Sequence, residues 1–221
     1  MKKFDVVIFD LDSTLVTIEG LVWLAEQIGK KRAVDRLTKL SMEGKLSVKL
    51  AMQKKMLLIS PSLSDLEKLG QKYCQSLVKG ARETIEILHH LGKEVFIVTG
   101  NVQPATGILG KYLRIKPENV ISARAFFDKK GHFQSFDSNH PLSKNSGKAT
   151  IIRQFDKKKK TVFIGDAVTD LETKEYVDLF IGYGGVAKRG KVKKAANVFL
   201  ESPNLLSVLD YILTDEEKNK L

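Results

Sequence analysis

The sequence contains little cysteine and no long apolar segment. Cys74 is the only cysteine among 221 residues, so an intrachain disulfide and a disulfide-stapled scaffold are excluded. The strongest apolar runs, at residues 6–9 and 95–98, have the length of a strand and are far shorter than a membrane span. The N-terminal MKKFDVVIFD reaches an acidic residue too early for a signal peptide. We therefore expect a cytoplasmic protein that has no membrane partner.

Acidic residues are outnumbered: 37 Lys and Arg oppose 26 Asp and Glu, for a formal charge of +11. The basic runs lie at residues 30–36, 156–160 and 188–194. A basic surface can attract nucleic acid, but these runs lack interleaved aromatic residues and any nucleic-acid motif. We interpret them as solvated surface and expect no nucleic-acid partner.

Short apolar segments alternate with amphipathic helical segments along most of the chain. The predicted strands are residues 4–9, 94–99, 120–127, 161–165, 177–181 and 197–200. This alternation predicts an α/β fold with a doubly wound, mainly parallel, Rossmann-like sheet that is covered by helices on both faces. Residues 123–136 break the rhythm with two strand-like halves around a glycine, which predicts a β-hairpin.

The first two predicted strands are separated by a long helical insertion. Residues 19–78 are helical in pattern almost throughout, with a stop at Pro61 and a new N-cap at Ser62. We predict a helical cap subdomain at 16–78 and an α/β core formed by 1–15 and 79–221. Such a cap would cover the carboxyl ends of the strands, where open α/β sheets bind ligands.

Carboxylates follow two of the predicted strands. Asp10 and Asp12 end VVIFDLDSTLV, and they point to one side if strand geometry persists. Asp166 and Asp170 follow the strand VFIG. Because carboxylate oxygens suit a hard cation such as Mg²⁺, we expect Asp166 to complete a metal site with the first pair, and Asp170 to support it.

Two further polar signals follow strands or open helices nearby. Thr99 and Gly100 end a strand with a hydroxyl and an unhindered backbone N–H, which suits an anion. Lys148 opens a helix just before the strand that leads to Asp166, where it could pair with a phosphate or offset carboxylate repulsion. Each signal alone is weak, but their joint placement favours a functional site.

In order, DLDST, TGN, Lys148 and GDAVTD resemble the four motifs of the haloacid-dehalogenase superfamily of Mg²⁺-dependent phosphohydrolases. The resemblance covers nearly the whole chain. Within the superfamily, DLDSTLVTIEGLVWLA and FDSNHPLSKNSGKA look most like phosphoserine phosphatases. The resemblance implies a phosphomonoester hydrolase that acts on O-phosphoserine, in serine biosynthesis, or on a similar small phosphorylated metabolite.

The resemblance also assigns roles to the motif residues. Asp10 would be the nucleophile that forms an aspartyl-phosphate, and Asp12 the acid and base. Asp10, the Asp12 backbone carbonyl and Asp166 would hold Mg²⁺. The residues expected to hold the phosphoryl group are Thr99, Gly100 and Lys148, with Asp170 orienting Lys148 or a metal-bound water.

Some positions depart from the family pattern. Asn101 replaces the glycine usual in the second motif, and Thr169 matches a polar position that would assist the phosphate. In the cap, Glu19 matches the residue that binds the substrate ammonium, and Met42 a position that faces the substrate. The carboxylate-binding Arg and the packing Phe of the family align with Lys55 and Val48.

Three alternatives stay open from the sequence. A phosphotransferase would share the aspartyl-phosphate and pass it to an alcohol other than water. A receiver-like signalling domain also uses strand-end carboxylates, Mg²⁺, a Thr and a Lys, but it has no need of Asp12 or of a large helical insertion. A monomer and a homodimer are equally compatible with the sequence.

Overall fold

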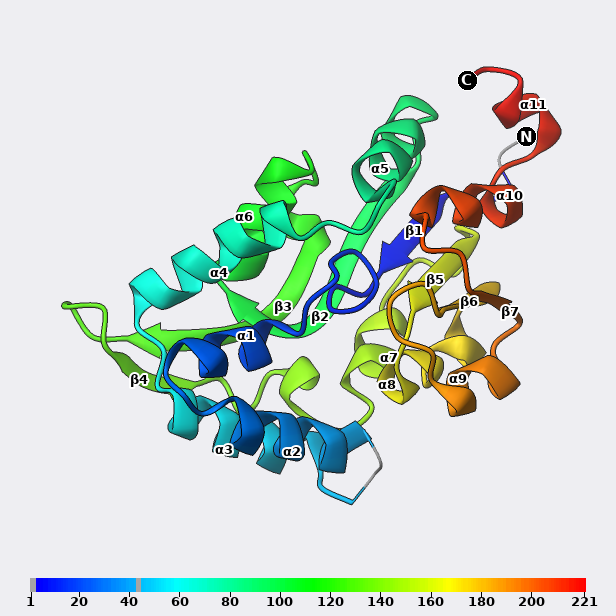
Figure 1. The fold of residues 1–221 in the computed structure, drawn as a ribbon. Coiled ribbons are helices and arrows are strands. Elements are labelled where there is room, and N and C mark those ends of the chain that lie inside the picture. Colours follow the sequence, from blue (N-terminus) through cyan, green and yellow to red (C-terminus); the bar gives the residue numbers. More distant parts are fainter. Residues whose placement is uncertain (1–2, 43–44) are drawn as a thin grey trace.

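A seven-stranded sheet with the order β4-β3-β2-β1-β5-β6-β7 forms the centre of the computed structural model, which describes residues 3–42 and 45–221 (Figure 1). The strands are β1 (Val6–Phe9), β2 (Glu94–Gln103), β3 (Val120–Phe127), β4 (Phe133–Phe136), β5 (Thr161–Gly165), β6 (Leu179–Tyr183) and β7 (Val198–Leu200). Neighbouring strands pair in parallel except β3 and β4, which are antiparallel. The predicted α/β fold and the predicted hairpin are confirmed.

β1 lies at the centre of the sheet because both of its faces are apolar. Val7 and Phe9 pack into one core cluster, whereas Val6 and Ile8 pack into the other, and all four are buried. Alternate residues of a strand point to opposite faces, so an unbroken apolar run is what a sheet buried on both sides requires.

The core helices are divided between the two faces. Helices α5 (Ala81–His90), α6 (Ala105–Tyr112) and α10 (Leu209–Ile212) contribute side chains to the cluster of Val7 and Phe9. Helices α7 (Gly147–Ile152), α8 (Val168–Leu171) and α9 (Gly190–Ala195) contribute to the cluster of Val6 and Ile8, and they gather together in Figure 1. The sheet is therefore doubly wound, and α11 (Asp215–Lys218) ends the chain.

Register aligns the strand ends that carry the polar motifs. Phe9, the last residue of β1, lies opposite Ile97 of β2 and Ile164 of β5. Residues that follow these positions therefore emerge at one edge of the sheet. The chain leaves β1 toward β2 and later returns to β5 on the other side, so this edge is also a topological switch point.

Four strands differ in their bounds from the prediction. β1 begins two residues later, at Val6, and β7 one residue later, at Val198. β6 begins at Leu179, two residues later than expected, because Asp178 bonds to Thr161 through its backbone N–H and accepts the Thr161 N–H on its side chain, at 2.9 and 2.7 Å. β2 continues to Gln103, with a register shift between Thr99 and Val102. Strand β2 therefore carries a bulge at the predicted anion site.

Four helices follow β1: α1 (Gly20–Gln27), α2 (Lys31–Met42), α3 (Val48–Ile59) and α4 (Leu63–Gln75). The predicted N-cap at Ser62 is confirmed, since Asp65 and Ser62 form a reciprocal capping box. Figure 1 shows α2 and α3 side by side. α4 packs so closely on the core helix α6 that a Cβ at Gly70 would lie 2.8 Å from Ile108. This contact does not show where a cap would begin or end, so the cap boundaries at residues 16–78 stay a prediction.

Within the described part of the chain, no helix combines the length and the apolar character needed to cross a membrane.

Candidate active site

The loop after β1 turns sharply and does not continue the strand. The Leu11 carbonyl accepts hydrogen bonds from the backbone N–H groups of Thr14, Leu15 and Val16, at 2.9–3.2 Å. Ser13 has a φ of 55°, in the left-handed region that such a turn needs. Both Asp10 and Asp12 line one cavity, although strand geometry ends at Phe9.

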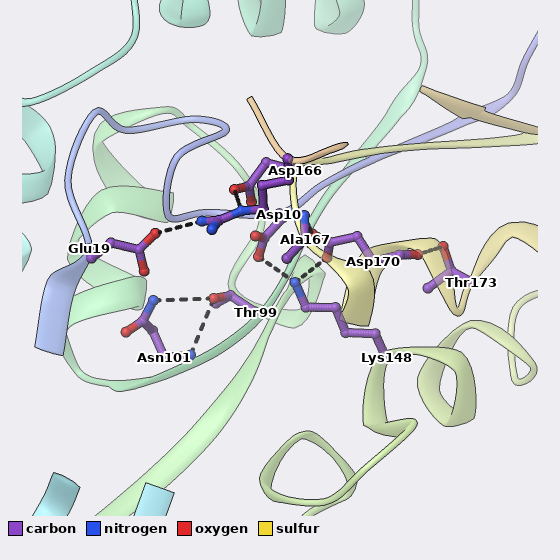
Figure 2. Close-up of polar contacts among 10 residues, drawn as sticks. Asp10, Glu19, Thr99, Asn101, Lys148, Asp166, Ala167, Asp170 and Thr173 are labelled. Carbon is purple, nitrogen blue, oxygen red and sulfur yellow. Dashed lines mark hydrogen bonds and ion pairs between the residues drawn. The ribbon is translucent and has the colours of Figure 1, made fainter. Parts of the chain in front are cut away.

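Lys148 bridges two buried carboxylates. Its Nζ lies 2.6 Å from Oδ1 of Asp10 and also donates to Oδ1 of Asp170 (Figure 2). Burial opposes the charge of Lys148, but the two carboxylates raise its pKa, so the ammonium remains charged. Burial and the charge of Asp170 raise the pKa of Asp10 to about 7, although Lys148 acts in the opposite direction.

Asp170 is fixed by its own turn. Its Oδ2 accepts the Ala167 N–H at 2.9 Å, and its backbone carbonyl accepts the Thr173 hydroxyl at 2.7 Å. A Cβ at Gly165 would lie 2.5 Å from Cγ of Asp170, so the strand must end in glycine for this carboxylate to fit. The turn therefore presents one remaining oxygen of Asp170 to Lys148.

Arg189 joins the other carboxylates of the site and is absent from the predicted set. Its Nε lies 2.6 Å from Asp166, and its Nη2 lies 3.3 Å from Glu19, which also accepts the Ser13 hydroxyl at 2.9 Å. Arg189 therefore connects Asp166 with Glu19. Burial raises the pKa of Asp166 well above its usual value, and Arg189 limits the rise. The basic run at 188–194 is thus only partly solvated surface, and its composition carried no signal that one member turns inward.

Asp12 sits between these groups in a poorly solvated position. Its Oδ2 accepts the Gly20 N–H at 2.9 Å, whereas its Oδ1 is buried and has no hydrogen bond from any described residue. Burial and the neighbouring charge of Glu19 raise the pKa of Asp12 to about 8. The geometry therefore favours a protonated Asp12 at neutral pH.

The bulge in β2 forms the opposite wall. Thr99 pairs with Ser122 and Val102 with Ala123, so Gly100 and Asn101 are extra residues outside the ladder. Asn101 donates to the Thr99 hydroxyl from its backbone N–H at 3.2 Å and from its side chain at 3.4 Å. A bulge frees backbone groups from strand pairing, as an anion site requires.

A cavity of about 620 Å³ lies between this edge of the sheet and helices α1, α2 and α3. Thr169 lines it from α8, while Glu19, Val48 and Lys55 line it from α3 and from the residue before α1. No described residue forms an ion pair with Lys55; burial lowers its pKa, and the charges of Glu19, Asp12 and Asp35 oppose that shift. Met42 ends α2, and its predicted place at the substrate lies outside the described side chains.

The carboxylates fit a divalent metal ion. Asp10, Asp166 and Asp170 each offer an oxygen, and these atoms lie within 4.8 Å of one another. Both oxygens of Asp170 already accept hydrogen bonds, whereas the contacts of Asp10 with Lys148 and of Asp166 with Arg189 each involve one oxygen. Asp10 and Asp166 are therefore the better ligands, and Asp170 is the better partner for Lys148.

Comparison with known proteins agrees with this geometry. The sequence matches haloacid dehalogenase-like hydrolases over residues 4–177. The chain belongs to this hydrolase family. It is 32% identical to a phosphoserine phosphatase of Bos taurus over 199 residues, which cover 89% of this chain and 88% of the relative.

Solved structures give the same family. A phosphoserine phosphohydrolase-like protein from Francisella tularensis superposes with a TM-score of 0.82 and 26% identity, covering 96% of this chain and all of that one. A phosphoserine phosphatase structure, described as a phospho-aspartyl intermediate analogue, has a TM-score of 0.79 and 25% identity, with coverage of 96% and 100%. The family predicted from the four motifs, and with it the hydrolase class, is confirmed.

The raised carboxyl pKa values predict how stability depends on pH. Asp10 and Asp12 have an ordinary value of 3.8 when unfolded and values of about 7 and about 8 when folded. The folded state holds these protons more tightly, so the stabilisation is complete below pH 3.8 and is lost as pH rises toward 8. We expect the melting temperature of the metal-free protein to fall by roughly 5 °C between pH 5 and pH 8.

Millimolar Mg²⁺ should reverse this fall, and more strongly at pH 8, because metal ligands must lose their protons. Melting curves with EDTA and with Mg²⁺ at both pH values test this. The control, Asp12→Asn, should show a smaller fall because one titrating group is gone. An unchanged melting temperature across all these conditions would contradict the description of the site.

Proposed function

We propose that the protein is a Mg²⁺-dependent phosphomonoester hydrolase that works through an aspartyl-phosphate at Asp10, with O-phosphoserine or a similar small phosphorylated metabolite as substrate. The observation that carries this proposal is the buried Asp10, which pairs with Lys148 and lies close to Asp166 at the cavity. The relative from Bos taurus is a phosphoserine phosphatase, which supports the substrate class. The product would then be serine, which connects the reaction with serine biosynthesis.

The proposed reaction has two halves, formation of the aspartyl-phosphate and its hydrolysis. An Asp10 oxygen bonds to phosphorus while the bond to the alcohol oxygen breaks, and Asp12 gives its proton to that oxygen. Asp12 then takes a proton from water, whose oxygen attacks phosphorus and releases Asp10 and phosphate. The pKa of about 8 at Asp12 supports the first half, since the proton is present at neutral pH.

The remaining residues orient the phosphoryl group. Lys148, the Thr99 hydroxyl and the backbone N–H groups of the bulge would stabilise its negative charge, with Asn101 and Thr169 at its edges. Mg²⁺ held by Asp10, Asp166 and the Asp12 carbonyl would neutralise the charge of the nucleophile and the phosphate together. Residues 16–78 would act as the cap that excludes water from this step.

Asp10→Asn tests the proposed role of Asp10 as the nucleophile. The amide has the same shape but does not attack phosphorus, so phosphate release should fall by about 10³-fold or more without loss of fold. Phosphate release from phosphoserine and circular dichroism check this, with the exposed Asp210→Asn as the control. Activity within about tenfold of wild type would rule out the covalent mechanism.

The metal role of Asp166 predicts a different kind of defect. Asp166→Asn removes a ligand charge, so the Mg²⁺ concentration for half-maximal activity should rise roughly 10- to 100-fold. High Mg²⁺ should restore part of the activity, because the loss is one of affinity. Asp10→Asn serves as the comparison and should stay inactive at every Mg²⁺ concentration. An Asp166 variant that high Mg²⁺ never rescues would show that Asp166 is not a replaceable ligand.

The cap predicts loose binding of phosphoserine. Glu19 and Lys55 both line the cavity, where Glu19 would bind the substrate ammonium and Lys55 its carboxylate. Lysine is a mobile point charge, whereas arginine grips a carboxylate with two parallel hydrogen bonds. Val48 also covers less apolar surface than a Phe would, so water reaches the ion pairs more easily.

We therefore expect Lys55→Arg to raise kcat/KM for phosphoserine by about fivefold, since one additional hydrogen bond contributes about 1 kcal/mol net. Lys54→Arg, on the exposed side of α3, is the matched control and should leave kcat/KM unchanged. Measurements should include other small phosphorylated acids and alcohols. The prediction of loose phosphoserine binding is wrong if phosphoserine is already the best substrate by a wide margin and Lys55→Arg brings no gain in kcat/KM.

A further inference from the structure

Two buried polar atoms beside the acid/base residue lack hydrogen bonds. Among the described residues, neither the hydroxyl of Tyr73 nor Oδ1 of Asp12 has a hydrogen-bond partner. Tyr73 belongs to α4 and is fully buried, whereas Asp12 lies in the loop after β1. Buried polar groups in proteins are nearly always satisfied, so two unsatisfied atoms in one place need a reason.

The Tyr73 hydroxyl contacts Gly20, the residue whose backbone binds Asp12. A Cβ at Gly20 would lie 1.8 Å from the hydroxyl oxygen, so Gly20 and Tyr73 are in direct contact. The backbone N–H of that same Gly20 donates to Oδ2 of Asp12 at 2.9 Å. Burial, followed by the nearby charges of Asp12 and Glu19, raises the pKa of Tyr73 well above its usual value. The hydroxyl therefore keeps its proton and is available as a hydrogen-bond donor.

Packing alone does not explain the hydroxyl. A phenylalanine at position 73 would fill the same core space without bringing an unsatisfied polar group into it. Furthermore, the hydroxyl demands a glycine at position 20, because any side chain there would collide with it. The oxygen atom therefore constrains two elements, α1 and α4, and contributes no hydrogen bond to either.

We propose that Tyr73 is a positioning residue for Asp12: its hydroxyl hydrogen-bonds the Asp12 carboxyl, directly or through one water, beside the Gly20 N–H. This inference rests on the proposed role of Asp12 as the acid that protonates the leaving alcohol. The Gly20 N–H holds Oδ2, and the Tyr73 hydroxyl would hold the otherwise unsatisfied Oδ1, so that both oxygens of the carboxyl are fixed. The carboxyl is thereby held in the orientation that proton transfer requires.

The leaving group provides a test that a structural role would not affect. An alkyl phosphate such as phosphoserine expels a strongly basic alkoxide and depends on proton transfer from Asp12. An aryl phosphate such as p-nitrophenyl phosphate expels a stable phenolate and does not depend on it. Since kcat/KM reports on the steps through departure of the alcohol, the two substrates separate positioning of the acid from binding and folding.

Tyr73→Phe is the test variant and Tyr183→Phe its matched control. Tyr183 is also fully buried and its hydroxyl also lacks a described partner, but it lies on β6 against Gly185. We expect Tyr73→Phe to lower kcat/KM for phosphoserine by about tenfold and for p-nitrophenyl phosphate by less than about twofold, as partial loss of acid catalysis would. Its melting temperature should fall by no more than a few degrees, the effect of one lost buried hydrogen bond. Tyr183→Phe should leave kcat/KM unchanged for both substrates.

Asp12→Asn separates failure of this inference from failure of the proposed function. If Asp12→Asn discriminates strongly between the two substrates but Tyr73→Phe affects both equally, or neither, the positioning role is wrong and the role of Asp12 stands. If Asp12→Asn itself shows no leaving-group dependence, the proposed function fails at Asp12. A melting temperature of Tyr73→Phe well below wild type, with unchanged kinetics, would make the hydroxyl purely structural.

Discussion

The ammonium of Lys148, buried between the carboxylates of Asp10 and Asp170, is the interaction on which the site depends. A buried carboxylate without a cation is strongly destabilising, so Asp10 could not end an apolar strand unaided. Asp170 gives Lys148 a second fixed partner, because its own geometry is set by the Ala167 N–H and by the glycine at position 165. Asp10, the proposed nucleophile, is thus held by Lys148 and, through it, by Asp170, and neither of these side chains takes part in the proposed bond changes.

The fold supplies this arrangement through strand order. β1 lies between β2 and β5 in matched register, so the loops that follow all three strands meet at one edge. Helices α1, α2 and α3 lie over that edge, and Arg189 contacts both Asp166, after β5, and Glu19, beside α1. Any cation at Asp166 and any ammonium at Glu19 would share a carboxylate with this arginine. The proposed metal site and the proposed substrate site would therefore be electrostatically linked.

Much of this could be predicted from the sequence, because the strongest signals are local. Unbroken apolar runs such as VVIF identify buried strands, and polar residues that follow them must emerge at the sheet edge. Asp10, Asp12, Thr99 and Asp166 were found in this way, and Lys148 was found from its place at the start of a helix. All five line the same cavity.

Other features depend on contacts between distant segments and left no local signal. Arg189 and Glu19 are 170 residues apart, and a basic run looks the same whether or not one member turns inward. The bulge at Gly100 is set by pairing with β3, and the contact of Tyr73 with Gly20 by the packing of α4. Periodicity places a residue on the buried face of a helix, but it does not say which atom that residue will meet.

The central claim, that Asp10 carries the phosphoryl group, is tested most directly by trapping it. A phosphomonoester with Mg²⁺ would be mixed with excess enzyme, quenched in acid within the first turnover, and the digested chain mapped by mass spectrometry. We predict that the peptide containing Asp10 carries a phosphate. This phosphate should be short-lived in wild type and absent from Asp10→Asn. Turnover with no phosphorylated peptide at any time, or with phosphate on another residue, would contradict it.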